Sequence, residues 1–336
     1  MAHLVIQTSF LGDVVLTTPL LHALAADAPV DVVTTPQAAP LLDGHPAVRR
    51  IIIYDKRGAD RGIAALLQHA RQLRATRYDA AYLAQGSVRS GALAWAARIP
   101  RRVGFDRSAG ARWYTERVRY DADAHHAERL LSLAGVTASE PLRPLLAPSS
   151  SAREAAAALL AACTSTDQRP LIALAPGSVW ATKRWAYFPE LAAALAPTAR
   201  LLLIGGPDDR PLADAMVAQA GPDALIVDAV GRVSLPVSAA LIGAADAIVS
   251  NDSLPLHLAS AMGTPTVAIF GPTVPAMGFG PLAPRAAIVE HESLSCRPCH
   301  AHGPMRCPLA HFRCMRDTPV ARVLSALLAV GVPLPG

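Results

Sequence analysis

Short apolar segments that alternate with helix-like segments are the feature that most limits how this chain can fold. Segments such as LVIQ (4–7) and IIIY (51–54) are apolar at nearly every position, not at every second one. Strands of this kind are buried on both faces, which is typical of parallel sheets with helical crossovers. We expect strands at 4–7, 30–35, 51–54, 79–84 and 101–105, and again at 171–176, 200–206, 225–231, 247–252, 266–271 and 286–291.

The stretch from residue 143 to residue 170 separates these two series. It has Pro- and Ser-rich ends around an Ala-rich helix, which is typical of a connection between domains. We therefore predict an α/β protein with two Rossmann-like, doubly wound domains that face each other across a cleft. The predicted boundaries are 1–150 and 151–320, with a C-terminal helix at 318–336. Because such sheets bind ligands beyond the carboxyl ends of their strands, polar residues at those points are the candidates for function.

Composition and charge exclude several classes of protein. Of the 336 residues, 52% are hydrophobic, and the formal net charge is +5. The positive charge is spread along the chain without a dense basic run, so a nucleic acid partner is not expected. A modest positive excess suits anionic small molecules or an anionic membrane surface. Neither a signal peptide nor an apolar window of about 18 residues is present, which predicts a cytoplasmic protein.

The first polar cluster follows the strand at 4–7. Gly12 allows a tight turn there, and Asp13 stands at the start of a helical pattern. Asp13 has two interpretations: an N-cap of that helix, or a general base that projects into the cleft.

The second cluster is APGSVWATKRW (175–185). A strand ends in Pro-Gly-Ser178, and Lys183 and Arg184 follow within one short loop. Backbone amides at such a turn suit a phosphate group, Lys183 adds a point charge, and Arg184 adds a planar guanidinium. The alternative is a solvated surface loop.

The third cluster lies in SNDSLPLHLASAMGTPTVAIFGPT (250–273). Asp252 and Ser253 end a strand and precede a helix that carries His257 one turn later. Taken alone, Asp252 is an N-cap and His257 a packed histidine. Together with the loop at 175–185, they predict a clamp for a diphosphate at a helix N-terminus.

Four of the five cysteines crowd into the tail of the second domain. Cys296, Cys299, Cys307 and Cys314 have the spacing C-x2-C-x7-C-x6-C, whereas Cys163 stands alone. This spacing is compatible with a structural zinc or iron site. The alternatives are unliganded thiols that pack a loop, and disulfides. In a cytoplasmic chain, a metal or reduced thiols take precedence over disulfides.

The motifs FLGDVVLTTPLL, PGSVWATKRW and SNDSLPLHLASAMGTPTVAIFGPT together resemble the ADP-heptose:lipopolysaccharide heptosyltransferases, glycosyltransferase family nine. QGSVRS (85–90), RIPRRVGF (98–105) and HHAERLL (125–131) resemble the N-terminal domain of that family. The TKRW loop and the cysteine-rich tail resemble its heptosyltransferase II branch. The resemblance implies the GT-B fold, with an acceptor-binding first domain and a nucleotide-sugar-binding second domain. It also implies inverting transfer of heptose without a cofactor.

The resemblance also implies roles for individual residues. Asp13 matches the base that deprotonates the acceptor hydroxyl, and Lys183 matches the cation that binds the donor diphosphate and stabilises the leaving ADP. The expected donor-binding residues are Gly12, Ser178, Lys183, Asp252, Ser253 and His257. Arg89, Arg101 and Arg102 match a region that meets the acceptor, although the two later arginines have the alternative role of capping a strand.

The implied partners are ADP-heptose and an anionic lipopolysaccharide core acceptor at the surface of the inner membrane. One position departs from the family pattern: Leu254, followed by Pro255, stands where glycine is usual. This departure keeps two alternatives open. One is a GT-B transferase that uses another nucleotide sugar or a protein acceptor, and the other is a non-catalytic nucleotide-binding homologue.

Overall fold

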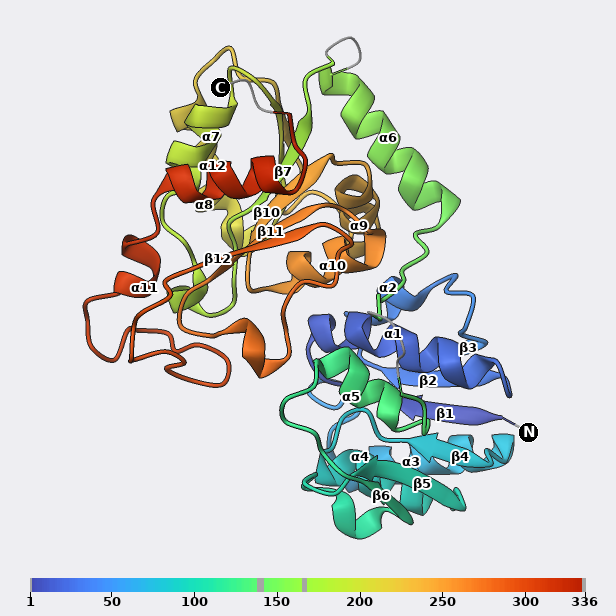
Figure 1. The fold of residues 1–336 in the computed structure, drawn as a ribbon. Coiled ribbons are helices and arrows are strands. Elements are labelled where there is room, and N and C mark those ends of the chain that lie inside the picture. The colour runs from blue at the N-terminus through green and yellow to red at the C-terminus, as the bar shows by residue number, and fades with distance from the viewer. Residues whose placement is uncertain (1, 138–141, 165–167, 334–336) are drawn as a thin grey trace. The chain divides into compact units, whose positions relative to one another are not determined.

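The computed structural model describes residues 2–137, 142–164 and 168–333. The chain divides into two compact units, Met1–Ala147 (the N-terminal unit) and Pro148–Gly336 (the C-terminal unit). Each unit contains one six-stranded sheet in which every neighbouring pair is parallel, with helices packed around it (Figure 1). The two Rossmann-like α/β units expected of the GT-B fold are thus confirmed.

The sheet of the N-terminal unit has the strand order β3-β2-β1-β4-β5-β6. Its strands are β1 (His3–Ile6), β2 (Val30–Thr34), β3 (Arg50–Ile53), β4 (Ala80–Tyr82), β5 (Arg101–Phe105) and β6 (Glu116–Val118). Its helices are α1 (Leu11–Ala25), α2 (Ala39–Leu42), α3 (Gly62–Thr76), α4 (Val88–Ala96) and α5 (His126–Ser132). The sequence prediction missed β6, whose three residues are two charged side chains and one valine and form no apolar run.

Burial on both faces explains why these strands are apolar throughout. In β1, Val5 packs into a cluster that includes Val14 of α1 and Leu130 of α5. Its neighbours Leu4 and Ile6 point to the other face, into a cluster with residues of α3 and α4. Successive side chains of a strand alternate between faces, so a strand covered on both sides needs an apolar residue at each position.

The sheet of the C-terminal unit has the order β12-β11-β10-β7-β8-β9. Its strands are β7 (Leu171–Ala175), β8 (Arg200–Leu203), β9 (Ile226–Asp228), β10 (Ala247–Asn251), β11 (Thr266–Phe270) and β12 (Ala286–Glu290). Its helices are α6 (Ser150–Thr164), α7 (Phe188–Leu195), α8 (Arg210–Ala220), α9 (Leu235–Gly243), α10 (Leu254–Met262), α11 (Arg313–Arg316) and α12 (Val320–Ala329), and a short 3-10 turn, η2, spans Ala181–Lys183.

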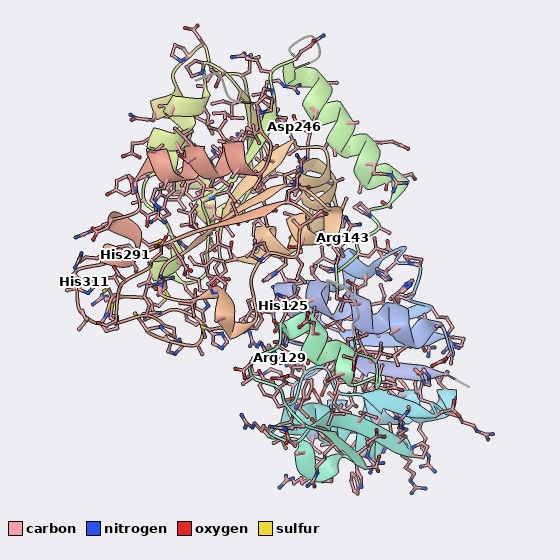
Figure 2. The ribbon with its side chains drawn as sticks, in the orientation of Figure 1. His125, Arg129, Arg143, Asp246, His291 and His311 are labelled. Carbon is pink, nitrogen blue, oxygen red and sulfur yellow. The ribbon has the colours of Figure 1, made fainter. Side chains whose placement is uncertain are left out.

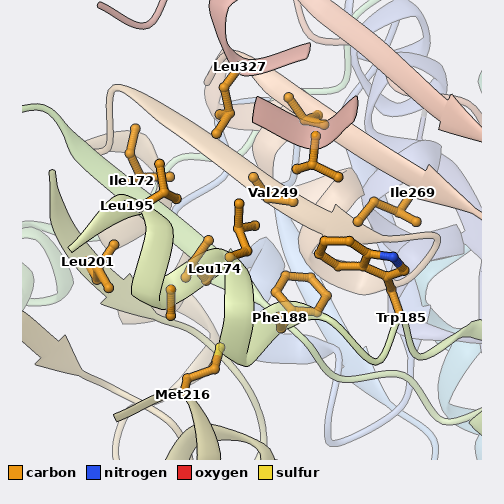
Figure 3. Packing of buried hydrophobic residues seen from close by; sticks show 14 of the residues in the cluster. Ile172, Leu174, Trp185, Phe188, Leu195, Leu201, Met216, Val249, Ile269 and Leu327 are labelled. Carbon is orange, nitrogen blue, oxygen red and sulfur yellow. The ribbon is translucent and has the colours of Figure 1, made fainter. Parts of the chain in front are cut away.

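The core of the C-terminal unit anchors the loop between β7 and α7. Trp185, at the end of this loop, is 2% exposed and packs edge-on against Phe188 (Figure 3). Its indole Nε1 donates a hydrogen bond of 2.9 Å to the carbonyl of Thr318. Because both ends of the loop are held by buried residues, its polar side chains occupy defined positions.

Each sheet has a point at which the direction of strand order reverses. It lies between β1 and β4 in the N-terminal unit and between β7 and β10 in the C-terminal unit. Loops diverge on either side of such a point and leave a crevice at the carboxyl ends of the strands. The loops that follow β1, β7 and β10 carry the three polar clusters predicted from the sequence.

Among the helices of the described residues, none has both the length and the apolarity to cross a bilayer.

Candidate functional site

Asp13 lies in the first turn of α1, beyond the carboxyl end of β1. The N-cap of α1 is Phe10, so the interpretation of Asp13 as an N-cap is wrong. One carboxylate oxygen, Oδ2, accepts a hydrogen bond of 2.6 Å from Ser9 Oγ. The side chain is 20% exposed, so the carboxylate is held by the protein yet reaches the surface of the unit.

His126, the first residue of α5, faces the other oxygen of this carboxylate. Its Nε2 lies 3.8 Å from Asp13 Oδ1. Burial, with Arg129 and His125 as further causes, lowers the pKa of His126 to about 3. The imidazole is therefore neutral near pH 7, and its contact with Asp13 is not an ion pair. Helix α5 begins here because His125 and Glu128 form a reciprocal capping box; His125 and Arg129 mark this helix in Figure 2.

Polar side chains join the loops that follow β1 and β4, at the point where the strand order of the N-terminal unit reverses. Thr8 Oγ1, after β1, donates to Gln85 Oε1, after β4, at 3.3 Å. Lys56 Nζ donates to Thr8 Oγ1 at 3.0 Å. Burial, followed by the charges of Arg57 and Arg89, lowers the pKa of Lys56. A group of cations therefore stands at the same edge of the sheet as Asp13.

Arg89, on α4, supports the chain that follows β3. Its Nη2 donates to the carbonyls of Asp60 (2.6 Å) and Gly62 (3.0 Å), and its guanidinium lies over the ring of Tyr54. Arg89 and Lys56 thus combine a structural role with a positive potential at the carboxyl edge.

Arg101 and Arg102 lie at the opposite edge of the sheet. They open β5, and Arg101 is level with Ala80, which is itself level with His3 at the start of β1. Arg101 Nε pairs with Glu116 at 2.8 Å, and Arg102 Nε donates to the carbonyl of Trp113 at 2.7 Å. The structure does not bring them together with Asp13, and their contacts fit the alternative in which they stabilise the end of a strand.

In the C-terminal unit, Lys183 and Asp252 form a buried ion pair. Lys183 Nζ lies 2.5 Å from Asp252 Oδ2, and the two residues are 8% and 6% exposed. Thr273 Oγ1 donates to the same oxygen at 2.6 Å. The pair joins the loop after β7 to the loop after β10, at the point where the strand order reverses. Buried charges of this kind must be paired, because the desolvation of a lone charge is expensive.

Asn251 fixes the same two loops through the backbone. Its Nδ2 donates to the carbonyl of Pro176 at 2.7 Å, and its Oδ1 accepts from the amide of Trp185 at 3.1 Å. The side chain is fully buried. Asn251 thus ties both ends of the loop that carries Lys183 to the end of β10.

The turn at Ser178 is held from within the loop. Ser178 Oγ accepts from the amide of Trp180 at 3.3 Å, and Arg184 Nε donates to the carbonyl of Ser178 at 2.8 Å. Arg184 therefore supports the turn, while Lys183 faces the end of β10. The 9% exposure of Ser178 and the 8% exposure of Lys183 overturn the alternative of a solvated loop.

Helix α10 begins at Leu254, two residues after Asp252. Its N-cap is Ser253, so the interpretation of Asp252 as an N-cap is also wrong. Leu254 and Pro255 occupy the first turn, and His257 is buried on the same helix, 6.4 Å from the ring of Phe279. The N-terminus of α10, the positive end of its dipole, thus follows two residues after the Asp252 that pairs with Lys183, which is an arrangement suited to an anion.

The four clustered cysteines are free thiols. Cys299 Sγ donates to the carbonyl of Cys296, and burial raises the pKa of Cys299 and raises that of Cys314 to about 11. Within the described ranges, no three His, Cys, Asp or Glu side chains form a group that could hold a metal ion. The predicted structural zinc or iron is therefore unsupported. His291 and His311 mark this segment in Figure 2.

Several residues of the site were not predicted as members of it. They are Ser9, Lys56, His126, Asn251 and Thr273. Asn251 ends the apolar run that located Asp252, and Thr273 follows the next run, β11, so their position at a strand end was the available signal. Ser9, Lys56 and His126 have no comparable signal, since hydroxyl and basic side chains are common in surface loops.

Comparison with known proteins identifies the family of the chain. Residues 66–307 match glycosyltransferase family 9 (heptosyltransferase). The chain is 30% identical over 304 residues to lipopolysaccharide heptosyltransferase 2 of Salmonella typhimurium, and the match covers 85% of this chain and 87% of the relative.

Solved structures extend the comparison to the fold. The structure of ADP-heptose lps heptosyltransferase II from E. coli matches with a TM-score of 0.81 and 27% identity over 98% of both chains. A family 9 glycosyltransferase from Veillonella parvula shares the fold, with a TM-score of 0.86 and 24% identity over 98% of this chain and 96% of that one. With a sequence match over most of its length and the fold of these enzymes, the chain belongs to glycosyltransferase family 9, the heptosyltransferase family.

Proposed function

We propose that this protein transfers heptose from ADP-heptose, with inversion, to the inner core of lipopolysaccharide. The observation that carries this proposal is the similarity to heptosyltransferase 2 over 304 residues. The buried pair of Lys183 and Asp252 beside the first turn of α10 supports it, because a nucleotide diphosphate needs a cation and backbone amides.

Asp13 is the proposed general base. It would take the proton of the acceptor hydroxyl as the oxygen attacks the anomeric carbon of the sugar. Ser9 donates to one carboxylate oxygen and leaves the other to face neutral His126, so neither neighbour adds a positive charge that would weaken the base. General-base help of this kind contributes about 10²–10⁴-fold to a rate.

Lys183 is the proposed cation for the leaving diphosphate. As the bond to the sugar breaks, negative charge develops on the phosphate oxygen, and a fixed cation in a buried site stabilises it strongly. Ser178, Ser253 and His257 complete the proposed donor site, with Asp252 as the partner that holds Lys183. Gly12 belongs to the first turn of α1 beside Asp13, and we assign it no separate contact with the donor. No metal ion or cofactor takes part in these steps.

A second candidate is transfer from a different nucleotide sugar or to a protein acceptor. Leu254 favours it, because the first residue of α10 carries a side chain where glycine would let a phosphate approach the backbone closely. Leu254 is half-buried, so its side chain is part of the surface around this helix end.

A panel of ADP-, GDP- and UDP-sugars tests the donor directly. We expect ADP-heptose to raise the melting temperature most, since a ligand at about 100 times its Kd stabilises the native state by about 2.7 kcal/mol. Incubation with ADP-heptose and a core acceptor should then release ADP. A larger shift with another sugar nucleotide would establish the second candidate. Binding without release of ADP would identify a non-catalytic homologue.

We further propose that the enzyme works on its acceptor at an anionic membrane surface. Arg71, Arg74, Arg77 and Arg98 are exposed and line one hollow of about 830 Å³ in the N-terminal unit. None of the four pairs with a carboxylate of the described residues. Arg77 and Arg98 have φ of 54° and 57°, where glycine is less strained, so the basic side chains stand there at a conformational cost.

Apolar side chains adjoin this basic surface. Ile63 and Leu67 precede Arg71 and Arg74 on one side of α3 and are 77% and 43% exposed. Trp95, on the adjacent helix α4, is 54% exposed. Exposed aliphatic and indole groups next to arginines are typical of surfaces that settle at the boundary of an anionic bilayer.

Removal of the four arginines tests this surface. The variant Arg71→Gln/Arg74→Gln/Arg77→Asn/Arg98→Asn should bind vesicles with anionic lipid about 10²–10³-fold more weakly, since each basic residue near such a surface contributes about 1 kcal/mol. Sedimentation with vesicles measures the affinity. Turnover of a soluble acceptor should be unchanged.

A matched variant controls for net charge. Arg153, Arg232, Arg285 and Arg316 are exposed arginines of the C-terminal unit, and their replacement by glutamine removes the same charge. An equal loss of vesicle binding in this control would mean that net charge alone, and not this surface, attracts the membrane.

A further inference from the structure

Thr273 orients the carboxylate that holds Lys183. The residue follows β11, is 3% exposed, and donates from Oγ1 to Asp252 Oδ2 at 2.6 Å. Lys183 Nζ binds the same oxygen at 2.5 Å. A carboxylate with one partner can rotate about its side-chain bonds, whereas a second donor on the same oxygen restricts that rotation. The direction in which Asp252 offers Oδ2 to Lys183 therefore depends on Thr273.

The cysteine-rich segment packs against the stem of the same lysine. An added Cβ at Gly303 would lie 3.2 Å from both Cγ and Cε of Lys183, so the glycine backbone is close to the side chain. The next residue, Pro304, accepts a hydrogen bond through its carbonyl from Thr182 Oγ1. His302 stacks on Trp180 with an interplanar angle of 10°. Residues 302–304 thus cover the loop that carries Lys183.

The base of this segment is tied to the chain around Thr273. The amide of Cys299 donates to the carbonyl of Pro272 at 2.9 Å. The guanidinium of Arg297, 5% exposed, donates to the carbonyl of Thr273 at 3.0 Å and pairs with Glu290 at 2.6 Å. The segment therefore has a fixed position relative to Thr273, and both are connected to Lys183.

We propose that Thr273 and Gly303 are positioning residues for Lys183, the first through Asp252 and the second through direct packing on the lysine stem. The cysteine-rich segment, residues 296–314, then forms one side of the donor site. Neither residue needs to touch the donor. The proposal deepens the proposed function, because it assumes that Lys183 binds the diphosphate.

The pair Thr273→Val and Thr273→Ser tests the hydroxyl. Valine keeps the shape and removes the donor, and we expect kcat to fall about 10-fold or more with a smaller change in KM, since an ångström of misplacement can cost about 10²-fold. Serine keeps the hydroxyl and should retain most of the activity. Serine and valine variants of equal activity would contradict the role of the hydroxyl.

Thr266→Val is the matched control for loss of a buried hydroxyl. Thr266 lies in β11, is fully buried, and donates from Oγ1 to the carbonyl of Thr264. The two valine variants should lose similar thermal stability, but only Thr273→Val should lose turnover. An equal loss of turnover in the control would reduce Thr273 to a structural residue.

Gly303→Ala tests the second residue against Gly221→Ala. Gly303 and Gly221 both have a positive φ, +82° and +87°, so alanine strains the backbone at each position. No atom lies within 4 Å of a Cβ added at Gly221, whereas Lys183 meets the one added at Gly303. We expect turnover to fall in Gly303→Ala alone. If turnover falls equally in both variants, backbone strain, and not contact with the lysine, determines the effect. If it falls in neither, the proposed role of Gly303 is wrong.

A double-mutant cycle with Lys183→Met separates positioning from general destabilisation. If Thr273 acts through Lys183, Thr273→Val should have no further effect once the lysine is gone; additive losses would overturn the proposal. The affinity for ADP, measured by calorimetry, gives a second cycle that needs no transfer. If the chain proves inactive with every donor, the proposed function fails, and the calorimetric cycle still decides whether Thr273 positions Lys183.

Discussion

Asp13→Asn is expected to reduce kcat about 10²–10⁴-fold, the usual contribution of a general base. The amide keeps the shape of the carboxylate and can still accept the hydrogen bond from Ser9 Oγ, so the fold of the loop should survive. It cannot accept a proton at neutral pH. Steady-state transfer from ADP-heptose, with a discontinuous assay for released ADP, measures the loss.

The affinity for ADP distinguishes loss of the base from loss of the site. Asp13 belongs to the N-terminal unit, whereas the proposed diphosphate site lies entirely in the C-terminal unit. Asp13→Asn should therefore bind ADP as the parent does. Asp106→Asn, in which an exposed carboxylate of the same unit is changed, should leave both properties intact. Near-normal turnover in Asp13→Asn would mean that another group removes the proton.

Lys183→Met should cost about 10²–10³-fold in kcat, comparable to the removal of one fixed charge-stabilising donor from an active site. The methionine fills much of the space of the lysine stem but supplies no charge for the departing diphosphate. The affinity for ADP should fall in parallel, which sets this variant apart from Asp13→Asn. Lys183→Arg should not keep full activity. A guanidinium is larger and planar, and Gly303 packs closely against the side chain at this position.

Lys183→Met should also lower the free energy of unfolding by about 3–5 kcal/mol, because it leaves the buried carboxylate of Asp252 without its cation. The double variant Lys183→Met/Asp252→Asn removes that lone charge and should recover most of the melting temperature without recovering transfer. If the single variant keeps both its stability and its rate, Lys183 is neither the partner of Asp252 nor the cation of the site.

The family motifs in the sequence are enough to name the main residues of the candidate site. Asp13, Lys183 and Asp252 each follow an apolar run, and the carboxyl end of a parallel strand is where such folds bind ligands. The prediction is weaker where position along a strand matters. Arg101 and Arg102 open the strand at 101–105, which already placed them at its amino end, yet the resemblance assigned them to the acceptor site.

Local rules also misassign two helix starts. Asp13 and Asp252 have the residue type of an N-cap, yet the caps are Phe10 and Ser253. Propensity favours a residue at a cap, but a helix begins where the strand before it and the packing of its apolar face allow. In both cases the carboxylate is used instead for a contact with another side chain.

The two series of parallel strands, the loops that hold the polar residues, and the family could all be inferred from the amino-acid sequence. These properties depend on short sequence segments. A strand buried on both faces is apolar at each position, and a turn at a strand end carries small and polar residues. The folded chain was needed to show that Thr273 and Lys183 share one oxygen of Asp252, that Gly303 lies against Lys183, and that His126 faces Asp13. Such contacts join residues that are 21 to 122 positions apart, as in the bonds of Thr273 to Asp252 and of Thr182 to Pro304. Strand order and side-chain packing bring them together, and no local pattern in the chain records those distances.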